Sequence, residues 1–153
     1  MCDVSRAASV RWTSTAHSHR LTGPKPVNIV YGTWARPHRS IMKNFTPILD
    51  AVAAAPDHHR LIFEDERVRV LEACIKPGET TPLHTHRWPS AVYVISSDDF
   101  VRYDQEGTVV TDSRVLGIRS EAGSVVWLPP LEPHSVQNIG EQEARAIVFE
   151  IKN

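Results

Sequence analysis

Two histidines of this sequence are separated by a single residue. His84 and His86 follow a Pro77-Gly78 turn and precede the alternating run at residues 91–95. Side chains at positions i and i+2 of a β-strand point to the same face, so the two imidazoles are predicted to project together. Because neutral imidazole is the commonest metal ligand in proteins, this spacing predicts part of a metal site.

The stretch around these histidines resembles the first conserved motif of the cupin superfamily. That motif is Gly, five residues, His-x-His, three or four residues, Glu, six residues, Gly. Gly78, His84 and His86 match it, whereas Ser90 stands at the glutamate position and Ser97 at the last glycine. The match therefore keeps both histidines and loses the carboxylate.

A second stretch resembles the second cupin motif, which is Gly, five residues, Pro-x-Gly, two residues, His, three residues, Asn. Gly123, Pro129, His134 and Asn138 match it, and Leu131 replaces the glycine. With both motifs in the right order, the chain is identified as a member of the cupin superfamily over residues 60–151.

The resemblance implies a mononuclear site for one divalent transition metal, with three histidines as ligands: His84, His86 and His134. With Ser90 in place of glutamate, the ligands are neutral and the ion keeps its full charge, which favours anionic, chelating substrates. Fe(II) is the favoured ion, and Zn, Ni, Mn and Cu stay open. The alternative is that the histidines line the barrel and are satisfied by hydrogen bonds.

The resemblance predicts a metal-dependent cupin enzyme, most specifically a non-haem oxygenase of the dioxygenase type acting on a small anionic or aromatic acid. Two other functions stay open. One is a non-catalytic cupin that binds or senses a small molecule, favoured by the motif departures at Ser90, Ser97 and Leu131. The other is a metal-dependent isomerase or lyase. No catalytic side chain is identified.

Four further residues are candidates for a second layer around the metal or for contacts with substrate: Ser90, Arg87, Tyr93 and Gln137. Arg87 directly follows the second histidine and could clamp a carboxylate through two hydrogen bonds, the alternative being a solvated loop arginine. Tyr93 and Gln137 either line the cavity or fill the core.

One helix and about nine short strands are predicted. The helix spans residues 46–56, with Thr46 as N-cap, Pro47 in the first turn and Pro56 at its end. His58 and His59 are expected to be exposed linker residues. The strands are predicted at residues 61–64, 67–75, 90–96, 100–103, 108–112, 115–118, 124–128, 134–139 and 145–151.

This pattern predicts an all-β fold with a short N-terminal helix. The paired motifs select the double-stranded β-helix, the cupin jelly-roll barrel, which is wide enough to hold one small ligand.

Length, composition and charge limit the number of domains and the kinds of partner that the chain can have. At 153 residues, with 41% hydrophobic and 23% charged residues, residues 42–153 are predicted to form a single cupin domain. Residues 1–41 hold six Lys/Arg and one acid, and they are predicted to be a basic, disordered extension, either a targeting segment or an over-long start. The remainder holds eleven basic and seventeen acidic residues, which argues against a nucleic-acid partner.

The apolar runs and the cysteines of the sequence bear on membrane association and on the compartment of the protein. No apolar run approaches the ~20 residues of a membrane-spanning helix, so no membrane association is expected. Two cysteines, Cys2 and Cys74, give no disulfide framework and favour a reducing compartment, predicted to be the cytoplasm. Cys74 is expected to be a small buried hydrophobe. The family resemblance implies a homodimer.

Overall fold

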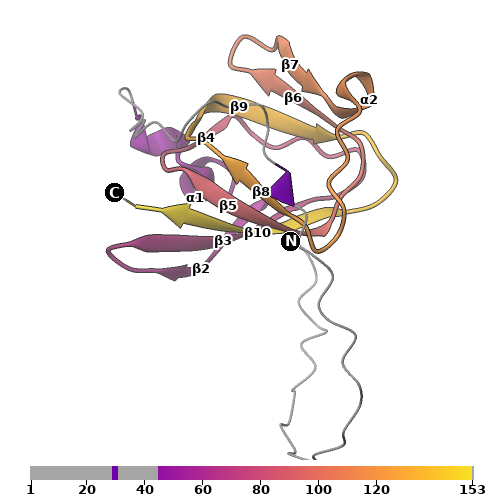
Figure 1. Cartoon of the computed structure of the whole chain (residues 1–153). Coiled ribbons are helices and arrows are strands. Elements are labelled where there is room, and N and C mark those ends of the chain that lie inside the picture. Colours follow the sequence, from indigo (N-terminus) through magenta and orange to yellow (C-terminus); the bar gives the residue numbers. More distant parts are fainter. Residues whose placement is uncertain (1–28, 31–44, 153) are drawn as a thin grey trace, which may run out of the picture.

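The computed structural model describes residues 29–30 and 45–152, which fold into two facing β-sheets (Figure 1). The strands of the first sheet are β1 (Ile29–Val30), β2 (His59–Glu64), β3 (Val68–Ile75), β5 (Ser90–Ser96), β8 (Val125–Leu128) and β10 (Ala144–Ile151). The strands of the second sheet are β4 (His84–His86), β6 (Phe100–Asp104), β7 (Val109–Asp112) and β9 (Leu131–Asn138). This architecture confirms the predicted double-stranded β-helix.

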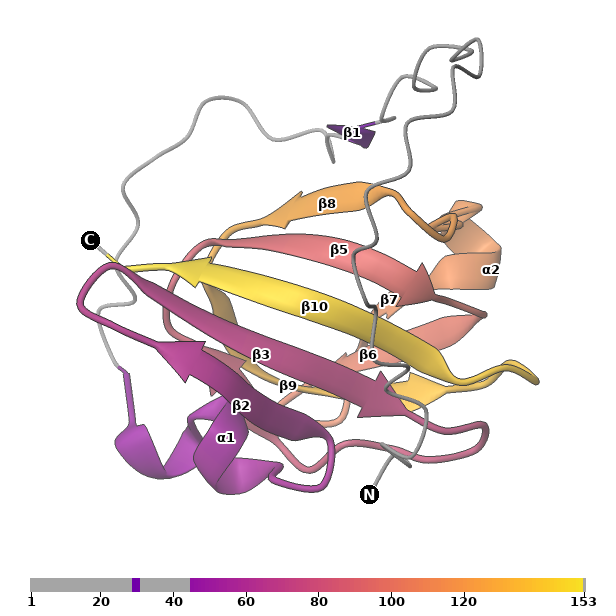
Figure 2. The same cartoon turned by 90° about the horizontal axis from the view of Figure 1, so that it is seen from below.

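The order of strands places distant parts of the chain together. The six-stranded sheet has the order β1-β8-β5-β10-β3-β2, and the four-stranded sheet has the order β4-β9-β6-β7. β10, the last strand, pairs with both β3 and β5 along most of its length and so lies inside its sheet (Figure 2). Side chains alternate along these strands, and the inward set forms an apolar cluster around Ala51, Leu71 and Val148.

The predicted helix over residues 46–56 forms as two short pieces. A 3₁₀ turn, η1 (Pro47–Leu49), is followed by α1 (Ala51–Ala54). Thr46 stands at the N-cap position of η1 with Pro47 in the first turn, as predicted, but its side chain makes no cap hydrogen bond. Asp50 caps α1 instead by accepting a hydrogen bond from the Val52 N–H, and its extended backbone interrupts the helix.

The helical segment ties β4 to the six-stranded sheet. α1 contacts both β2 and β4 and lies beside β2 in Figure 2. The Thr85 hydroxyl of β4 donates to the Leu49 carbonyl at 3.1 Å, and Thr85 forms a bridge with Asp50. The first residue of β2 is thereby brought near the His-x-His strand.

The strand predicted at residues 115–118 is wrong, because this stretch begins within one helical turn, α2 (Ser113–Leu116). Asp112 caps the turn by accepting from the Arg114 N–H, and Gly117 ends it at φ 63°. Val115 is 80% exposed, so the apolar run at residues 115–118 does not pack into the core as a strand.

Most of the basic segment 1–41 lies outside the described residues. Two of its residues, Ile29 and Val30, pair in parallel with Val125 and Val126 of β8. The domain boundary at residue 42 and the choice between a targeting segment and an over-long start therefore stay predictions. Within the described part of the chain, no helix has both the length and the hydropathy needed to cross a membrane.

Candidate metal centre

Four histidines gather between the two sheets. His84 and His86 come from β4, His134 from β9 and His59 from the start of β2, and each is at most 6% exposed. The centroid of the His84 ring lies 4.4 Å from that of His134, 4.6 Å from His59 and 5.2 Å from His86. These four residues are called the histidine cluster below.

Strand pairing explains how His84, His86 and His134 meet. His84 lies directly opposite His134 in the β4–β9 ladder, and a register shift separates it from His86. The two residues of the His-x-His unit share one face, as the spacing predicts. The structure thus places the three predicted ligands in one cluster of rings, but the group whose ligand atoms all lie within 4.8 Å of one another is His59, His84 and His86, without His134.

His59 was missed by the sequence reasoning, which expected an exposed linker residue. It is 5% exposed, and its ligand nitrogen, with those of His84 and His86, belongs to a group lying within 4.8 Å of one another. A turn after α1, in which the His59 N–H donates to the Ala55 carbonyl at 2.9 Å, carries His59 into the barrel. Neighbouring His58 is also only partly exposed, and its Nε2 lies 3.7 Å from Glu79.

Hydrogen bonds fix the orientation of three rings. His84 Nδ1 lies 2.8 Å from the Pro82 carbonyl, and His134 Nδ1 lies 2.8 Å from the Glu132 carbonyl. A carbonyl can only accept, so in both rings Nδ1 carries the proton and Nε2 keeps a free lone pair. These are the tautomers that a metal bound through Nε2 requires.

His86 has a stronger partner behind it. Its Nδ1 lies 2.7 Å from Oε1 of Glu150, which is fully buried on β10. Glu150 Oε2 accepts from Arg69 Nε at 2.5 Å, and Arg69 Nη1 reaches both oxygens of Asp50 at 2.9 Å. Burial alone would raise the pKa of Glu150, but the bonds from His86 and Arg69 outweigh it, so the pKa is lowered and the carboxylate is ionised.

The environment also keeps three of the imidazoles, those of His84, His134 and His59, neutral. Burial, reinforced by the neighbouring rings, lowers the pKa of His84 to about 4 and that of His134 to about 2. Burial likewise holds the pKa of His59 well below its usual value, and the His59 Nδ1 is buried without a hydrogen-bond partner in the described residues. Neutral rings with free nitrogens are the donor set that a divalent transition metal needs, so the residues fit such an ion.

Of the second-layer candidates, Ser90 lies nearest to this arrangement. It is 2% exposed on β5 and pairs directly with Glu150 across the β5–β10 ladder. Arg87 is half-buried, with its guanidinium 5.0 Å from the Phe45 ring and 5.3 Å from the Trp88 ring. Its Nε is buried and has no hydrogen-bond partner among the residues that the structure describes.

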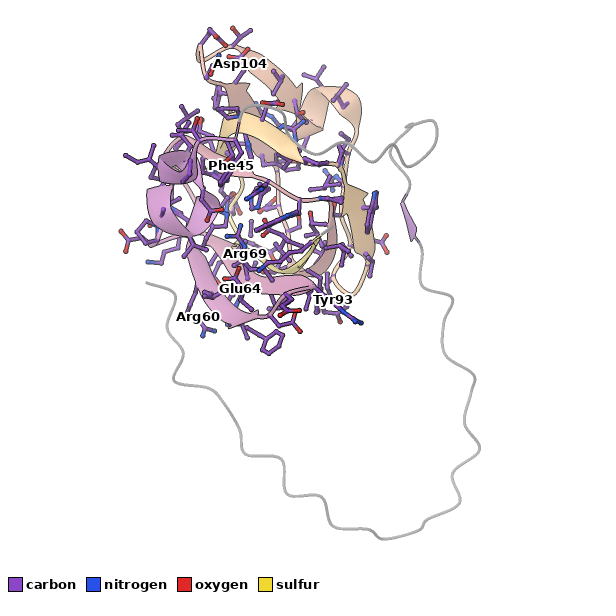
Figure 3. The ribbon with its side chains drawn as sticks, turned by 90° about the vertical axis from the view of Figure 1, so that its left-hand side faces the viewer. Phe45, Arg60, Glu64, Arg69, Tyr93 and Asp104 are labelled. Carbon is purple, nitrogen blue, oxygen red and sulfur yellow. The ribbon has the colours of Figure 1, made fainter. Side chains whose placement is uncertain are left out.

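Tyr93 and Gln137 do not join the cluster. Tyr93 is 43% exposed and alternates with the inward Val92 and Val94, so it lies on the outer face of its sheet (Figure 3). Gln137 lies between Val136 and Asn138 on β9, on the face opposite His134, where its side chain accepts from the Tyr103 hydroxyl at 2.9 Å. Their predicted roles at the site are wrong because strand parity turns both away from it.

Cys74 is buried on β3, 5% exposed, which confirms the expectation that it is a small buried residue. The other cysteine of the chain, Cys2, lies outside the described residues. The location of the protein stays a prediction.

A second residue was missed on β6. Arg102 pairs with Val136 in the β6–β9 ladder, which puts it on the same face as His134, two residues along. Its positive charge is among the causes that lower the pKa of His134. The signal in the sequence was a single arginine in an otherwise ordinary strand, which nothing marked as functional.

Comparison with known proteins supports the architecture. No protein-family model and no curated protein matches the chain. A cupin domain from Bordetella pertussis Tohama I superposes with a TM-score of 0.52 at 25% sequence identity, over 62% of this chain and 92% of that chain. An RmlC-like cupin family protein from Methanocaldococcus jannaschii, also a double-stranded β-helix, gives 0.45 at 15% identity, over 61% and 78% of the two chains.

Proposed function

The chain has the cupin fold and carries residues of both cupin motifs, and from this premise we propose that it is a metal-dependent cupin enzyme. Its one metal ion is held by His84, His86 and His134, with His59 as a fourth donor. The reaction we assign to it is that of a mononuclear non-haem oxygenase acting on a small anionic or aromatic acid. Fe(II) is the favoured ion because oxygenation needs a redox-active metal.

One observation carries the metal proposal. The rings of His84, His86 and His134 each direct Nδ1 to a protein acceptor, which leaves Nε2 free on all three. A histidine kept only for structure usually has both ring nitrogens in hydrogen bonds. Here, within the described residues, three neighbouring buried side chains each keep Nε2 without a protein hydrogen bond, as binding of one ion by all three requires.

The chain's own residues have defined tasks under this proposal. Glu150 holds His86 in one tautomer, and Arg69 and Asp50 hold Glu150 in turn. The sheets exclude water from the histidines, each of which is at least 94% buried. Bound Fe(II) would supply the redox chemistry that lets dioxygen react with an organic acid.

Metal content is the first test. Protein purified without a His tag should carry about one equivalent of a transition metal by elemental mass spectrometry, or take it up on anaerobic loading with Fe(II). His84→Ala and His134→Ala should each lose it. If wild-type protein binds no Fe(II), Mn(II) or Zn(II), the metal proposal is contradicted. The remaining alternative is then a non-catalytic cupin that binds a small molecule without a metal.

A matched pair of neighbours tests the fourth donor. His59→Gln should weaken metal binding, because the His59 nitrogen belongs to the tight group with His84 and His86. His58→Gln should not, because its ring lies by Glu79. The measurement is the visible spectrum of the Co(II)-loaded proteins, and identical spectra for wild type and His59→Gln would exclude His59 as a ligand.

Oxygen consumption separates the candidate functions. Fe(II)-loaded protein should consume oxygen with at least one member of a panel of small carboxylic acids and thiols, and His84→Ala should not. Turnover of an acid without oxygen uptake would instead identify an isomerase or lyase. Ligand binding without turnover, unchanged by removal of the metal, would identify a sensor or carrier.

The outer face of the six-stranded sheet favours a homodimer. A cross-strand row, Phe63–Val70–Phe149–Ala91–Trp127, crosses five strands, and its three aromatic side chains are 40–51% exposed. Such a contiguous apolar surface is typical of an association site. Light scattering should give twice the chain mass of 17.2 kDa for wild type and the single mass for Phe149→Lys, with Val115→Lys on α2 as control.

A further inference from the structure

Of the eight arginines in the described part of the chain, four form ion pairs with acids, and Arg102, on the His134 face of β6, is not among them. Arg69 pairs with Asp50 and Glu150 in the interior. The other arginines that pair with acids do so nearer the surface: Arg60 and Arg145 with Glu72, and Arg114 with Asp112. Within the described residues, the one hydrogen bond from the Arg102 side chain goes to the neutral Thr111 hydroxyl, at 3.1 Å.

The register places Arg102 beside the histidine cluster. Phe100, Arg102 and Asp104 of β6 lie opposite Asn138, Val136 and His134 of β9 without a register shift. Arg102 is therefore the diagonal neighbour of His134 on the same face, about 7–8 Å away between Cα atoms. An arginine side chain is long enough to cover that separation.

Asp104, which lies directly opposite His134 in the β6–β9 ladder, is already engaged. Asp104 Oδ1 accepts from the backbone N–H groups of Glu106 and Thr108, at 3.0 and 2.8 Å, and so closes the turn between β6 and β7. Arg102 is partly buried. Burial lowers the pKa of its guanidinium, and no acid of the described residues raises that pKa in compensation. A partly buried cation without a counter-ion costs free energy of folding, and a bound anion would offset this cost.

We propose that Arg102 binds the carboxylate of a small organic acid whose other end reaches the histidine cluster. This inference rests on the proposed function and narrows its substrate to molecules that carry an anionic group a few bonds from the group that meets the metal. Thr111 holds one N–H of the guanidinium, and the remaining donors are available for a bidentate bond to the carboxylate. Arg87, the sequence-based candidate, has its guanidinium against two aromatic rings instead.

Binding of matched acids and amides tests the assignment without requiring turnover. Acetate, propanoate and benzoate, each beside its uncharged amide, would be titrated by calorimetry into Zn(II)-loaded protein. Wild type should bind at least one acid at least tenfold more tightly than its amide, and Arg102→Gln should abolish that preference. Arg102→Lys should retain part of it, and Thr111→Val, which leaves the guanidinium in place, should weaken it less.

The remaining arms separate this inference from the metal proposal. Arg102→Gln should keep the metal stoichiometry of wild type, and Arg87→Gln should keep the acid preference. The inference is overturned if Arg102→Gln binds the acids like wild type, if the preference is lost in Arg87→Gln instead, or if wild type prefers none of the acids. If no variant or wild type binds metal, the proposed function fails, and the same titrations on metal-free protein still show whether Arg102 recognises a carboxylate.

Discussion

At the level of single residues, the carboxylate nearest the histidine cluster stands behind His86 on β10, beside Ser90 rather than at it. Ser90 and Glu150 are direct cross-strand neighbours, and Glu150 contacts His86 through Nδ1. The negative charge that the cupin motif places at the glutamate position is therefore present one strand away. Under the proposed function it would raise the basicity of the His86 imidazole instead of bonding to the ion itself.

Glu150→Gln should weaken metal affinity by about 10–100-fold while metal still binds, because amide and carboxylate have the same shape but differ in charge. Competition with a chromophoric chelator measures the affinity. Glu72→Gln is the control, since Glu72 is also buried between arginines but contacts no histidine of the cluster. Equal affinities of wild type and Glu150→Gln would show that Glu150 does not act on the metal through His86.

The residues of the site that sequence could reveal are those whose positions depend only on local spacing. His84 and His86 share a face through strand parity, and His134 was found through its motif. Glu150, His59 and Arg102 were missed because their positions depend on cross-strand register and on one turn after α1, which no local pattern encodes.

Among the elements, the short helix acts through Asp50. Asp50→Ala should lower the free energy of unfolding by about 2 kcal/mol or more, since it removes the N-cap of α1 and a buried partner of Arg69. Thr46→Ala, at the predicted cap that makes no cap bond, should stay within about 0.5 kcal/mol. Urea unfolding measures both, and equal losses would contradict the role of Asp50.

Three strands are joined through one carboxylate, and this should appear in the pH dependence of stability. Glu72 of β3 accepts from Arg60 of β2 and from Arg145 of β10. Burial alone would raise the pKa of Glu72, but these hydrogen bonds outweigh it and lower the pKa from 4.5. Because the folded-state pKa is lowered, the stabilisation is present above pH 4.5 and is lost as the pH falls through the lowered value.

Urea unfolding of metal-free protein between pH 3 and 7 tests this expectation. Wild type should be more stable than Glu72→Gln at pH 7, and the two curves should converge as the pH falls below 4.5. A difference that stays constant across this range would mean that Glu72 stabilises the strands by packing rather than by charge.

The strands were predictable because their apolar residues alternate and turns separate them, and eight of the nine predicted strands correspond to strands of the structure. The failures occurred at capping aspartates. Asp50 splits the predicted helix and Asp112 starts a helical turn where Val115 to Ile118 suggested a strand. A side chain that hydrogen-bonds its own backbone overrides a short apolar pattern.

For the whole molecule, metal binding and folding should be linked. An ion that binds the folded barrel and not the unfolded chain stabilises it by about 2.7 kcal/mol when its free concentration is 100 times the dissociation constant. Differential scanning calorimetry should therefore show a higher Tm with Zn(II) than after dialysis against chelator. His134→Ala should show no such increase, and an increase equal to that of wild type would place the binding elsewhere.

The four histidines do not belong to one sheet. His59 starts β2 of the six-stranded sheet, whereas His84, His86 and His134 belong to the four-stranded sheet. An ion held by all four would act as a cross-link between the two layers, closing a loop of about 75 residues from His59 to His134 and reducing the chain entropy available to partly open states. After removal of the metal, the first change expected is faster exchange of backbone amide hydrogens with solvent where the two sheets separate, before any strand unfolds.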